Sequence, residues 1–180
     1  MDDQIYKRHA QSYVDAGYWP RPIGQGSKGS HLPNWQKPNP KWTEKTVLDW
    51  QEKYAGAGIG LLLGSPLPDG TLLGALDIDN DDYVRVASVL LGGNPPCGRF
   101  GSKGIAYFVR VAGDGKYRQF KVKPDDGAEP VAVGELLCSK RLCVIPPTIH
   151  PKTKQPYYWV GKSLLKTPYT ELPIVEVQDD

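Results

Sequence analysis

The sequence has no long apolar run and no apolar amino-terminal segment. Among its 180 residues, no stretch approaches the roughly 20 consecutive apolar residues of a membrane-spanning helix. The opening residues, MDDQIYKRHA, are polar, which is not typical of a secretory signal. We therefore expect a cytoplasmic protein without a membrane partner.

Cysteine is scarce, with three residues in the whole chain. An odd number of cysteines is typical of free thiols rather than of a disulfide framework. Cys138 and Cys143 fall in segments with strand character, and no paired Cys-x-x-Cys motif is present. We therefore predict no structural zinc, and the chain is long enough to fold around an apolar core without one.

A strong net charge is also missing, because 22 Lys and Arg against 20 Asp and Glu leave only +2. Nucleic-acid-binding domains are usually basic, so the balance alone argues against such a partner. The charges are segregated, however: residues 99–123 hold seven basic side chains and one acidic, and residues 139–166 hold six basic and none acidic. Such blocks are typical either of ordinary solvated faces or of a basic surface beside an acidic site.

Glycine and proline are abundant, with 20 and 17 residues, which disfavours a helical bundle. Hydrophobic periodicity and turn residues predict an α+β fold, with helices on one face of a largely antiparallel sheet. The first expected helix spans 4–16. Thr43 caps the second, which buries Val47, Trp50 and Tyr54. The third runs from Asn80 or Asp81 to 91. The expected strands are 19–23, 58–63, 72–79, 105–111, 118–122, 131–137, 142–145 and 157–160. We predict a single domain over 1–180, divided into helices and a proline-rich arm (1–57), a catalytic sheet (58–172) and a tail (173–180).

An Asp-x-Asp pair ends the apolar strand Leu72–Asp79. Strand alternation places Asp77 and Asp79 on the same face. Two ionised carboxylates this close repel each other unless a cation lies between them, so the pair suits Mg²⁺ or Mn²⁺. Aspartates at a strand end also commonly cap a turn or the next helix, and this motif alone does not exclude that role.

Three later features could complete a phosphate-binding site. Arg99-Phe-Gly-Ser102-Lys103-Gly104 is a basic turn whose side chains and amides suit a triphosphate, or an ordinary solvated hairpin. Glu135 follows a β-branched run and is either a third acid or an outward-facing strand residue. In Pro146-Pro-Thr-Ile-His150 the prolines stiffen the strand exit, so that His150 is either a phosphate contact or a structural donor.

Taken in order, these segments resemble the primase-polymerase domain of the archaeo-eukaryotic primase superfamily, in the form found in phage and plasmid replication proteins. The resemblance covers residues from about 4 to 172. It rests on the arm from Ala16 to Trp35, on Leu76-Asp-Ile-Asp79, on Arg99-x-Gly-Ser-Lys-Gly104, on Glu135, and on the loop Pro146–Pro151 with Tyr157 and Trp159. One departure is clear, because the histidine that often ends the family's second motif is replaced here by Ala106.

The resemblance implies a sheet of RNA-recognition-motif type with an additional amino-terminal α/β unit. It implies a DNA primase and DNA-directed polymerase, a nucleotidyltransferase that uses NTPs or dNTPs, with two metals, Mg²⁺ or Mn²⁺, held by Asp77, Asp79 and Glu135. Nucleotide contacts would come from Arg99, Ser102, Lys103, Gly104 and His150. The template and primer would lie along basic segments, for which the candidate residues are Lys28, Trp35, Lys37, Arg141, Lys152 and Lys154.

The resemblance also implies a replicative helicase partner, in cis or in trans, and we expect a monomer. Two other functions stay open at this point. The replacement at Ala106 is compatible with a nucleic-acid-binding replication module whose catalysis is weakened. The same acids could also serve a metal-dependent nuclease or another phosphotransferase.

Overall fold

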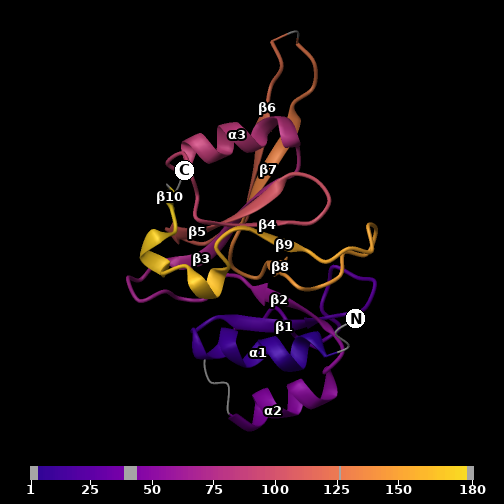
Figure 1. The fold of residues 1–180 in the computed structure, drawn as a ribbon. Coiled ribbons are helices and arrows are strands. Elements are labelled where there is room, and N and C mark those ends of the chain that lie inside the picture. The colour runs from indigo at the N-terminus through magenta and orange to yellow at the C-terminus, as the bar shows by residue number, and fades with distance from the viewer. Residues whose placement is uncertain (1–3, 39–43, 126, 178–180) are drawn as a thin grey trace.

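The computed structural model describes residues 4–38, 44–125 and 127–177, which form helices and two β-sheets (Figure 1). Within these ranges no helix is both long and apolar enough to cross a membrane. The helical elements are α1 (Ile5–Asp15), α2 (Glu44–Lys53) and α3 (Asp81–Leu90), with the 3-10 helices η1 (Leu164–Lys166) and η2 (Tyr169–Glu171).

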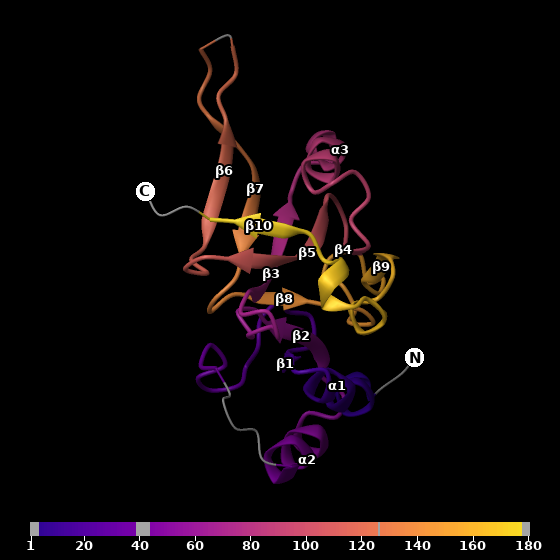
Figure 2. The same cartoon turned by 90° about the vertical axis from the view of Figure 1, so that its left-hand side faces the viewer.

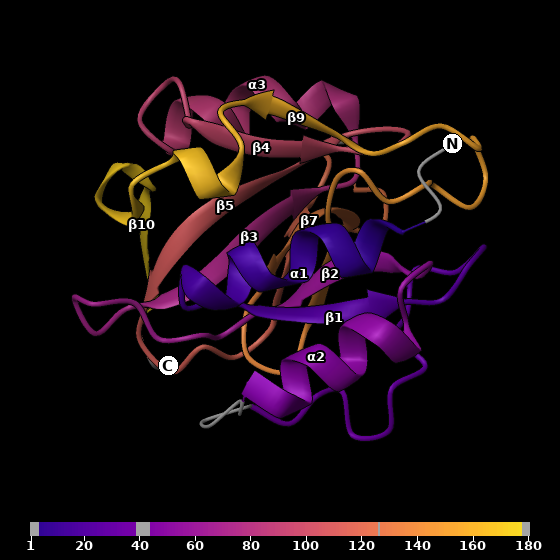
Figure 3. The ribbon, with the colours of Figure 1, turned by 60° about the horizontal axis from the view of Figure 1, so that its bottom comes forward.

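The smaller sheet joins segments that lie far apart in the sequence. Its strands are antiparallel in the order β1-β2-β8, namely β1 (Trp19–Ile23), β2 (Gly58–Leu62) and β8 (Leu142–Val144). Helix α1 lies across β1 and β2, and α2 packs beside α1 (Figure 3). This unit agrees with the additional amino-terminal α/β unit that the resemblance implies.

The larger sheet carries most of the remaining strands and is antiparallel in the order β6-β7-β3-β5-β4-β9. A further strand, β10, pairs in parallel with β5. The β6–β7 hairpin projects beyond the other strands (Figures 1 and 2). The strands are β3 (Leu72–Ile78), β4 (Cys97–Phe100), β5 (Ile105–Ala112), β6 (Arg118–Val122), β7 (Val131–Leu137), β9 (Tyr158–Gly161) and β10 (Ile174–Glu176).

The two faces of the larger sheet are covered by different elements (Figure 2). Helix α3 covers one face, where its Ala87 packs with Ile105 and Tyr107. The other face carries Phe108 and meets the smaller sheet and α1, with which it forms the main apolar core. Because side chains alternate along a strand, β3, β5 and β7 each contribute buried residues to both layers. The α+β fold predicted from the sequence is confirmed.

Local signals placed the helices correctly. Gly17 follows α1 with φ +84°, a conformation that glycine adopts without strain. The Asn80 side chain accepts the Asp82 N–H and so caps α3. Trp50 and Tyr54 pack against the main core as predicted for α2. The predicted cap Thr43 lies outside the described residues, and so does the side chain of Val47.

Two predicted boundaries are wrong. Residues 58–172 do not form one catalytic sheet, because β2 and β8 belong to the smaller sheet. The segment 173–180 is not only a tail, since Ile174–Glu176 forms β10. Strand β4 was not predicted either. It is short and directly follows Pro95-Pro96, and its partners β5 and β9 lie further along the chain.

Candidate active site

A row of polar side chains crosses the larger sheet on its core-facing side. Strand register sets Asp77 on β3 directly opposite Glu135 on β7 and, on its other side, opposite Ala106 on β5. Ala106 is in turn opposite Arg99 on β4. Directly opposed residues in an antiparallel pair point to the same face. The row therefore runs from Glu135 through Asp77 and Ala106 to Arg99.

Asp77 and Asp79 both line a cavity of about 150 Å³ beside this row. Asp77 is half-buried, whereas Asp79 lies beyond the last residue of β3 and is exposed. Burial raises the pKa of Asp77, Arg99 lowers it, and the charges of Asp79 and Glu135 raise it further. The carboxylates are thus close enough to repel one another, as the sequence predicted for the Asp-x-Asp pair.

The basic turn between β4 and β5 forms another wall of the cavity. Arg99, Ser102 and Lys103 line it together with Gly101. The N–H of Gly104, which was predicted to face a ligand, donates here to the Asp81 carboxylate at 2.6 Å. This bond ties the turn to the start of α3, directly after the strand that carries Asp77. The turn is therefore held against the acids by an aspartate in the first turn of α3.

Arg99 is the central cation of the cavity. Its guanidinium lies 5.0 Å from the centre of the Tyr157 ring and donates to the Cys143 sulfur at 3.4 Å. Its Nε atom is buried and has no hydrogen-bond partner among the described residues. A buried donor without a partner is costly, so a ligand acceptor at this point would be favourable.

His150 reaches the cavity from the loop that follows β8. Its buried imidazole accepts the N–H groups of Lys152 and Thr153 on Nδ1, each at 3.2 Å. Burial, with Lys28, Arg99 and Lys152, lowers its pKa. The neutral ring therefore carries its proton on Nε2, where it can donate a hydrogen bond.

Ala106 occupies the position where the related family often has histidine. Its side chain is fully buried in the main core, between Asp77 and Arg99 in the row. The positively charged and imidazole side chains that line the cavity are instead Lys28, Arg99, Lys103 and His150. A donor from a different loop therefore lies where phosphate groups could be held, although the strand position itself is apolar.

Glu135 lies opposite Asp77, but its carboxylate is hydrogen-bonded to side chains other than Asp77. Its Oε1 atom accepts the Tyr117 hydroxyl at 2.6 Å and the Gln119 amide at 3.3 Å. Within the described ranges, no three His, Cys, Asp or Glu side chains are grouped closely enough to enclose a metal ion. Carboxylate oxygens are the ligands that Mg²⁺ and Mn²⁺ prefer, and two of them line the cavity with the third in the next strand. The donor set therefore fits such an ion, with Asp77 and Asp79 in place and Glu135 turned toward Tyr117.

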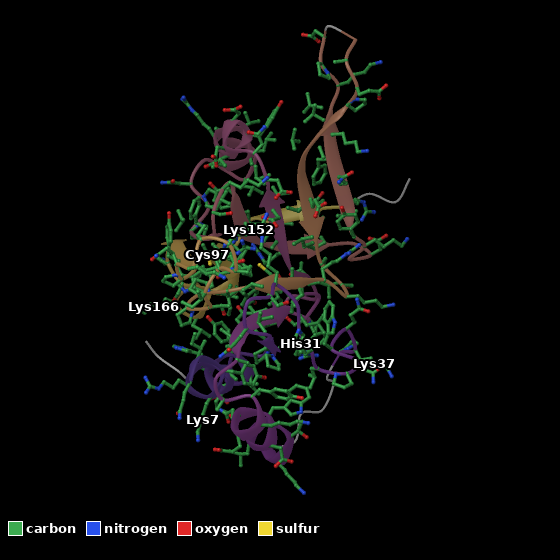
Figure 4. The ribbon with its side chains drawn as sticks, turned by 90° about the vertical axis from the view of Figure 1, so that its right-hand side faces the viewer. Lys7, His31, Lys37, Cys97, Lys152 and Lys166 are labelled. Carbon is green, nitrogen blue, oxygen red and sulfur yellow. The ribbon has the colours of Figure 1, made fainter. Side chains whose placement is uncertain are left out.

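The residues predicted to contact nucleic acid lie in two concave sites and on two loops. Lys28 lines the same cavity as Asp77, and Arg141 lines a second cleft beside Tyr117. Lys152 and Lys154 are exposed on the loop that carries His150. Figure 4 shows Lys152 on the loop that faces the viewer and Lys37 on the arm at the right-hand edge.

The arm that carries Trp35 and Lys37 is held by a buried arginine. Arg21 on β1 donates to the carbonyls of Trp35 and Lys37, each at 2.9 Å, and its guanidinium lies 5.8 Å from the centre of the Trp50 ring. Trp35 is half-buried, whereas Lys37 is exposed. Sequence reasoning missed Arg21, although a charged residue between two prolines in a buried strand was a visible signal.

Two aromatic residues were also missed as parts of the site. Tyr157 is buried and lies beside both Arg99 and His150. Tyr117 orients Glu135 through its hydroxyl, and this bond raises the pKa of Tyr117. The contact of Tyr157 with Arg99 and the hydrogen bond of Tyr117 to Glu135 each join different elements, so neither could be inferred from the residues next to the tyrosine.

Comparison with known proteins identifies one family. The family described as "Bifunctional DNA primase/polymerase, N-terminal" matches residues 10–175. That span includes both aspartates, the basic turn, Glu135 and the His150 loop. No curated protein matches the chain at a significant level.

Proposed function

The chain belongs to the bifunctional DNA primase/polymerase family, and from this premise we propose that it is a metal-dependent, template-directed nucleotidyltransferase in the replication of a phage, plasmid or other mobile element. Family membership implies primase or polymerase activity with DNA and nucleotides as substrates. The observation that carries the finer proposal is the shared cavity, where Asp77 and Asp79 face Arg99, Lys103 and His150.

The cations of the cavity would bind the triphosphate of the incoming nucleotide. Arg99 and Lys103 neutralise its charge, and the buried Arg99 Nε offers a donor that the protein leaves without a partner among the described residues. His150 contributes a neutral Nε2–H, so it can bind a phosphate oxygen without adding charge. Together these groups would draw the leaving pyrophosphate toward the β4–β5 turn, away from Glu135.

Asp77 and Asp79 would hold a divalent cation at the other side of the nucleotide, with Glu135 as the third ligand. When bound, Mg²⁺ or Mn²⁺ would offset the negative charge of the phosphates and increase the acidity of the attacking 3′-hydroxyl. Burial raises the pKa of Asp77, and repulsion from Asp79 and Glu135 raises it further; a bound cation would relieve that repulsion, which supports this role. Tyr117 would keep Glu135 in place until the ion binds, since its hydrogen bond holds only Oε1.

The DNA template would contact the arm and the His150 loop, where Lys37, Lys152 and Lys154 are exposed. Arg21 supports this role of the arm, because its hydrogen bonds keep the arm ordered beside the small sheet. The low net charge of +2 predicts weak binding that falls steeply with salt. A helicase, in cis or in trans, would then keep a monomeric enzyme on its template.

Nucleotide incorporation tests the proposal. The protein is incubated with a primed single-stranded template, Mg²⁺ or Mn²⁺, and labelled NTPs or dNTPs. We expect labelled product, and we expect the double variant Asp77→Asn/Asp79→Asn to lower its rate by more than roughly a hundredfold, because the cation loses two charged ligands. Asp82→Asn is the matched control, since Asp82 is an exposed acid on the first turn of α3 and does not line the cavity.

The other outcomes point to different functions. Product from the double variant at the wild-type rate would reject the assignment of the aspartates. Degradation of the template without added nucleotides would indicate a nuclease built on the same acids. Salt-sensitive DNA binding without incorporation under any template or metal would indicate a binding module that has lost catalysis.

A further inference from the structure

A second, larger cleft of about 510 Å³ lies beyond Glu135 and is unused by the roles proposed above for the nucleotide and the metal. Three separate segments form its walls: the arm through Gln36, the β5–β6 turn and the β7–β8 turn. The residues that line it are Gln36, Asp114, Gly115, Lys116, Tyr117, Ser139, Lys140 and Arg141.

A hydrogen bond joins the β5–β6 turn to the β7–β8 turn, so two walls of the cleft are fixed relative to each other. The Ser139 N–H donates to the Gly115 carbonyl at 3.0 Å. Gly115 has φ +66°, and a side chain there would approach Leu72 Cδ1 and Ser139 Oγ to 2.7 Å. Only glycine allows this close approach, which sets the spacing of the two turns.

The cleft carries an excess of positive charge. Its one acid, Asp114, is neutralised by ion pairs to Lys116 at 2.9 Å and to Arg118 at 3.0 Å, and hydrogen bonds from Arg118 and Lys116 hold its pKa well below its usual value. Lys140 and Arg141 are exposed at the rim, and the Arg141 guanidinium lies 4.1 Å from the centre of the Tyr117 ring. A concave surface of this composition suits a polyanion, such as a nucleic-acid backbone.

The position of the cleft relative to the acids indicates which strand it would take. Tyr117 lines the cleft and binds Glu135, which lies opposite Asp77 on the side away from Ala106 and Arg99. In phosphoryl transfer the attacking and leaving oxygens lie roughly in line on opposite sides of the phosphorus. If pyrophosphate leaves toward Arg99, the attacking hydroxyl has to approach from the Glu135 side, where this cleft opens.

We propose that this cleft binds the backbone phosphates of the primer strand, the strand whose 3′-hydroxyl attacks the nucleotide. Lys140 and Arg141 contact its phosphates, and Tyr117 lies where the strand ends at Glu135. This inference rests on the proposed function, since it needs the nucleotide to occupy the Arg99 cavity.

DNA binding, measured without nucleotide or catalysis, tests the inference separately from the proposed function. The variant is Lys140→Asn/Arg141→Gln; asparagine tolerates the φ of +61° at position 140. The control Lys45→Gln/Lys166→Gln removes the same charge from exposed residues that line neither cavity. Fluorescence anisotropy over a salt series compares a primer–template with a recessed 3′ end against the template strand alone.

We expect the wild-type protein and the control to bind the primer–template more tightly than the template strand, and the cleft variant to lose that preference. Two lost phosphate contacts weaken binding roughly 25- to 60-fold at about 0.1 M salt and reduce the salt slope by about 1.4 to 1.8. Thermal melting equal to that of the control shows that the turns remain folded. The KM for the incoming nucleotide, measured at saturating primer–template, stays at the wild-type value.

Three results would overturn the inference. The cleft variant could keep the full preference for the primer–template. It could lose affinity for the template strand alone by the same factor as for the primer–template, which would assign the cleft to the template strand. It could keep its affinity for the primer–template but require a higher concentration of the first nucleotide to begin synthesis without a primer. That result would assign the cleft to the triphosphate of the initiating nucleotide. The first two results are read from DNA binding alone and do not depend on whether Asp77 and Asp79 support incorporation, so the two proposals fail separately.

Discussion

The hydroxyl of Thr148 is predicted to be a major stabilising contact between the His150 loop and the small sheet. It accepts the Ile59 N–H at 2.6 Å and donates to the Ile59 carbonyl at 2.8 Å. The preceding residues of the loop, Pro146 and Pro147, have no N–H to offer β2. The Thr148 side chain is only 3% exposed, so the substitution Thr148→Val keeps the shape and removes both hydrogen bonds.

The loss of stability in Thr148→Val depends on which backbone groups of Ile59 keep a hydrogen-bond partner. The Ile59 carbonyl keeps the Ile145 N–H at 3.0 Å, so it stays satisfied. The Ile59 N–H loses its hydroxyl partner inside the core. Leaving a buried donor unsatisfied costs about 1–3 kcal/mol, and the second lost bond adds about 1 kcal/mol. We therefore expect Thr148→Val to lower the free energy of unfolding by about 2–4 kcal/mol.

Urea unfolding followed by circular dichroism measures this change. With a denaturant slope near 2 kcal/mol per molar, the midpoint should fall by about 1–2 M. Because His150 is two residues further along the loop, the KM for nucleotide should rise as well. Thr148→Ser keeps the hydroxyl and should recover most of the stability.

The matched control is Thr153→Val, in the same loop. Its exposed hydroxyl accepts only a long bond from Gln155, at 3.4 Å, so the change should be within about 0.5 kcal/mol of wild type. The reasoning is refuted if Thr148→Val unfolds within that same margin, because the two buried hydrogen bonds would then contribute nothing.

Two further predictions concern the cavity. Folding raises the pKa of Asp77, chiefly by burial. Ionised Asp77 therefore opposes folding. Its contribution to the free energy of unfolding falls as the pH rises above 3.8, the ordinary pKa of an aspartate. Asp77→Asn should therefore melt at a higher temperature than wild type at pH 7 and lose this advantage toward pH 4; a lower melting temperature at pH 7 would contradict the argument. Gly101→Ala would bring a Cβ to 2.5 Å from Tyr157 Cε1 and 3.2 Å from His150 Cδ2, and should cost about 1–3 kcal/mol and raise the KM for nucleotide. Gly29→Ala is its control, since a Cβ there meets only Ser27 Oγ, at 3.6 Å, and equal melting of the two variants would show that the cavity adapts.

The amino-acid sequence was sufficient to predict most of the secondary structure and the chemical character of the site. Helix and strand periodicities and the helix start at Asn80 or Asp81 are local features, and each is confirmed. Asp77 and Asp79 share a face because side chains alternate along any strand, whatever its partners are. The basic turn at Arg99–Gly104 was also visible as a run of residues.

Only the tertiary structure decided which of these segments meet. Strand pairing sets Glu135 opposite Asp77 and puts β2 and β8 into a separate sheet, and both depend on contacts between residues far apart in the chain. The same holds for Gly104, whose amide goes to Asp81, and for Tyr117, whose hydroxyl turns Glu135 away from the cavity. Periodicity reports which face of an element is buried, but hydrogen-bond partners are chosen by packing in three dimensions. The sequence therefore determined which groups could carry the chemistry, and the fold determined that His150 lines the cavity beside Asp77 while the side chain of Ala106 is buried in the core.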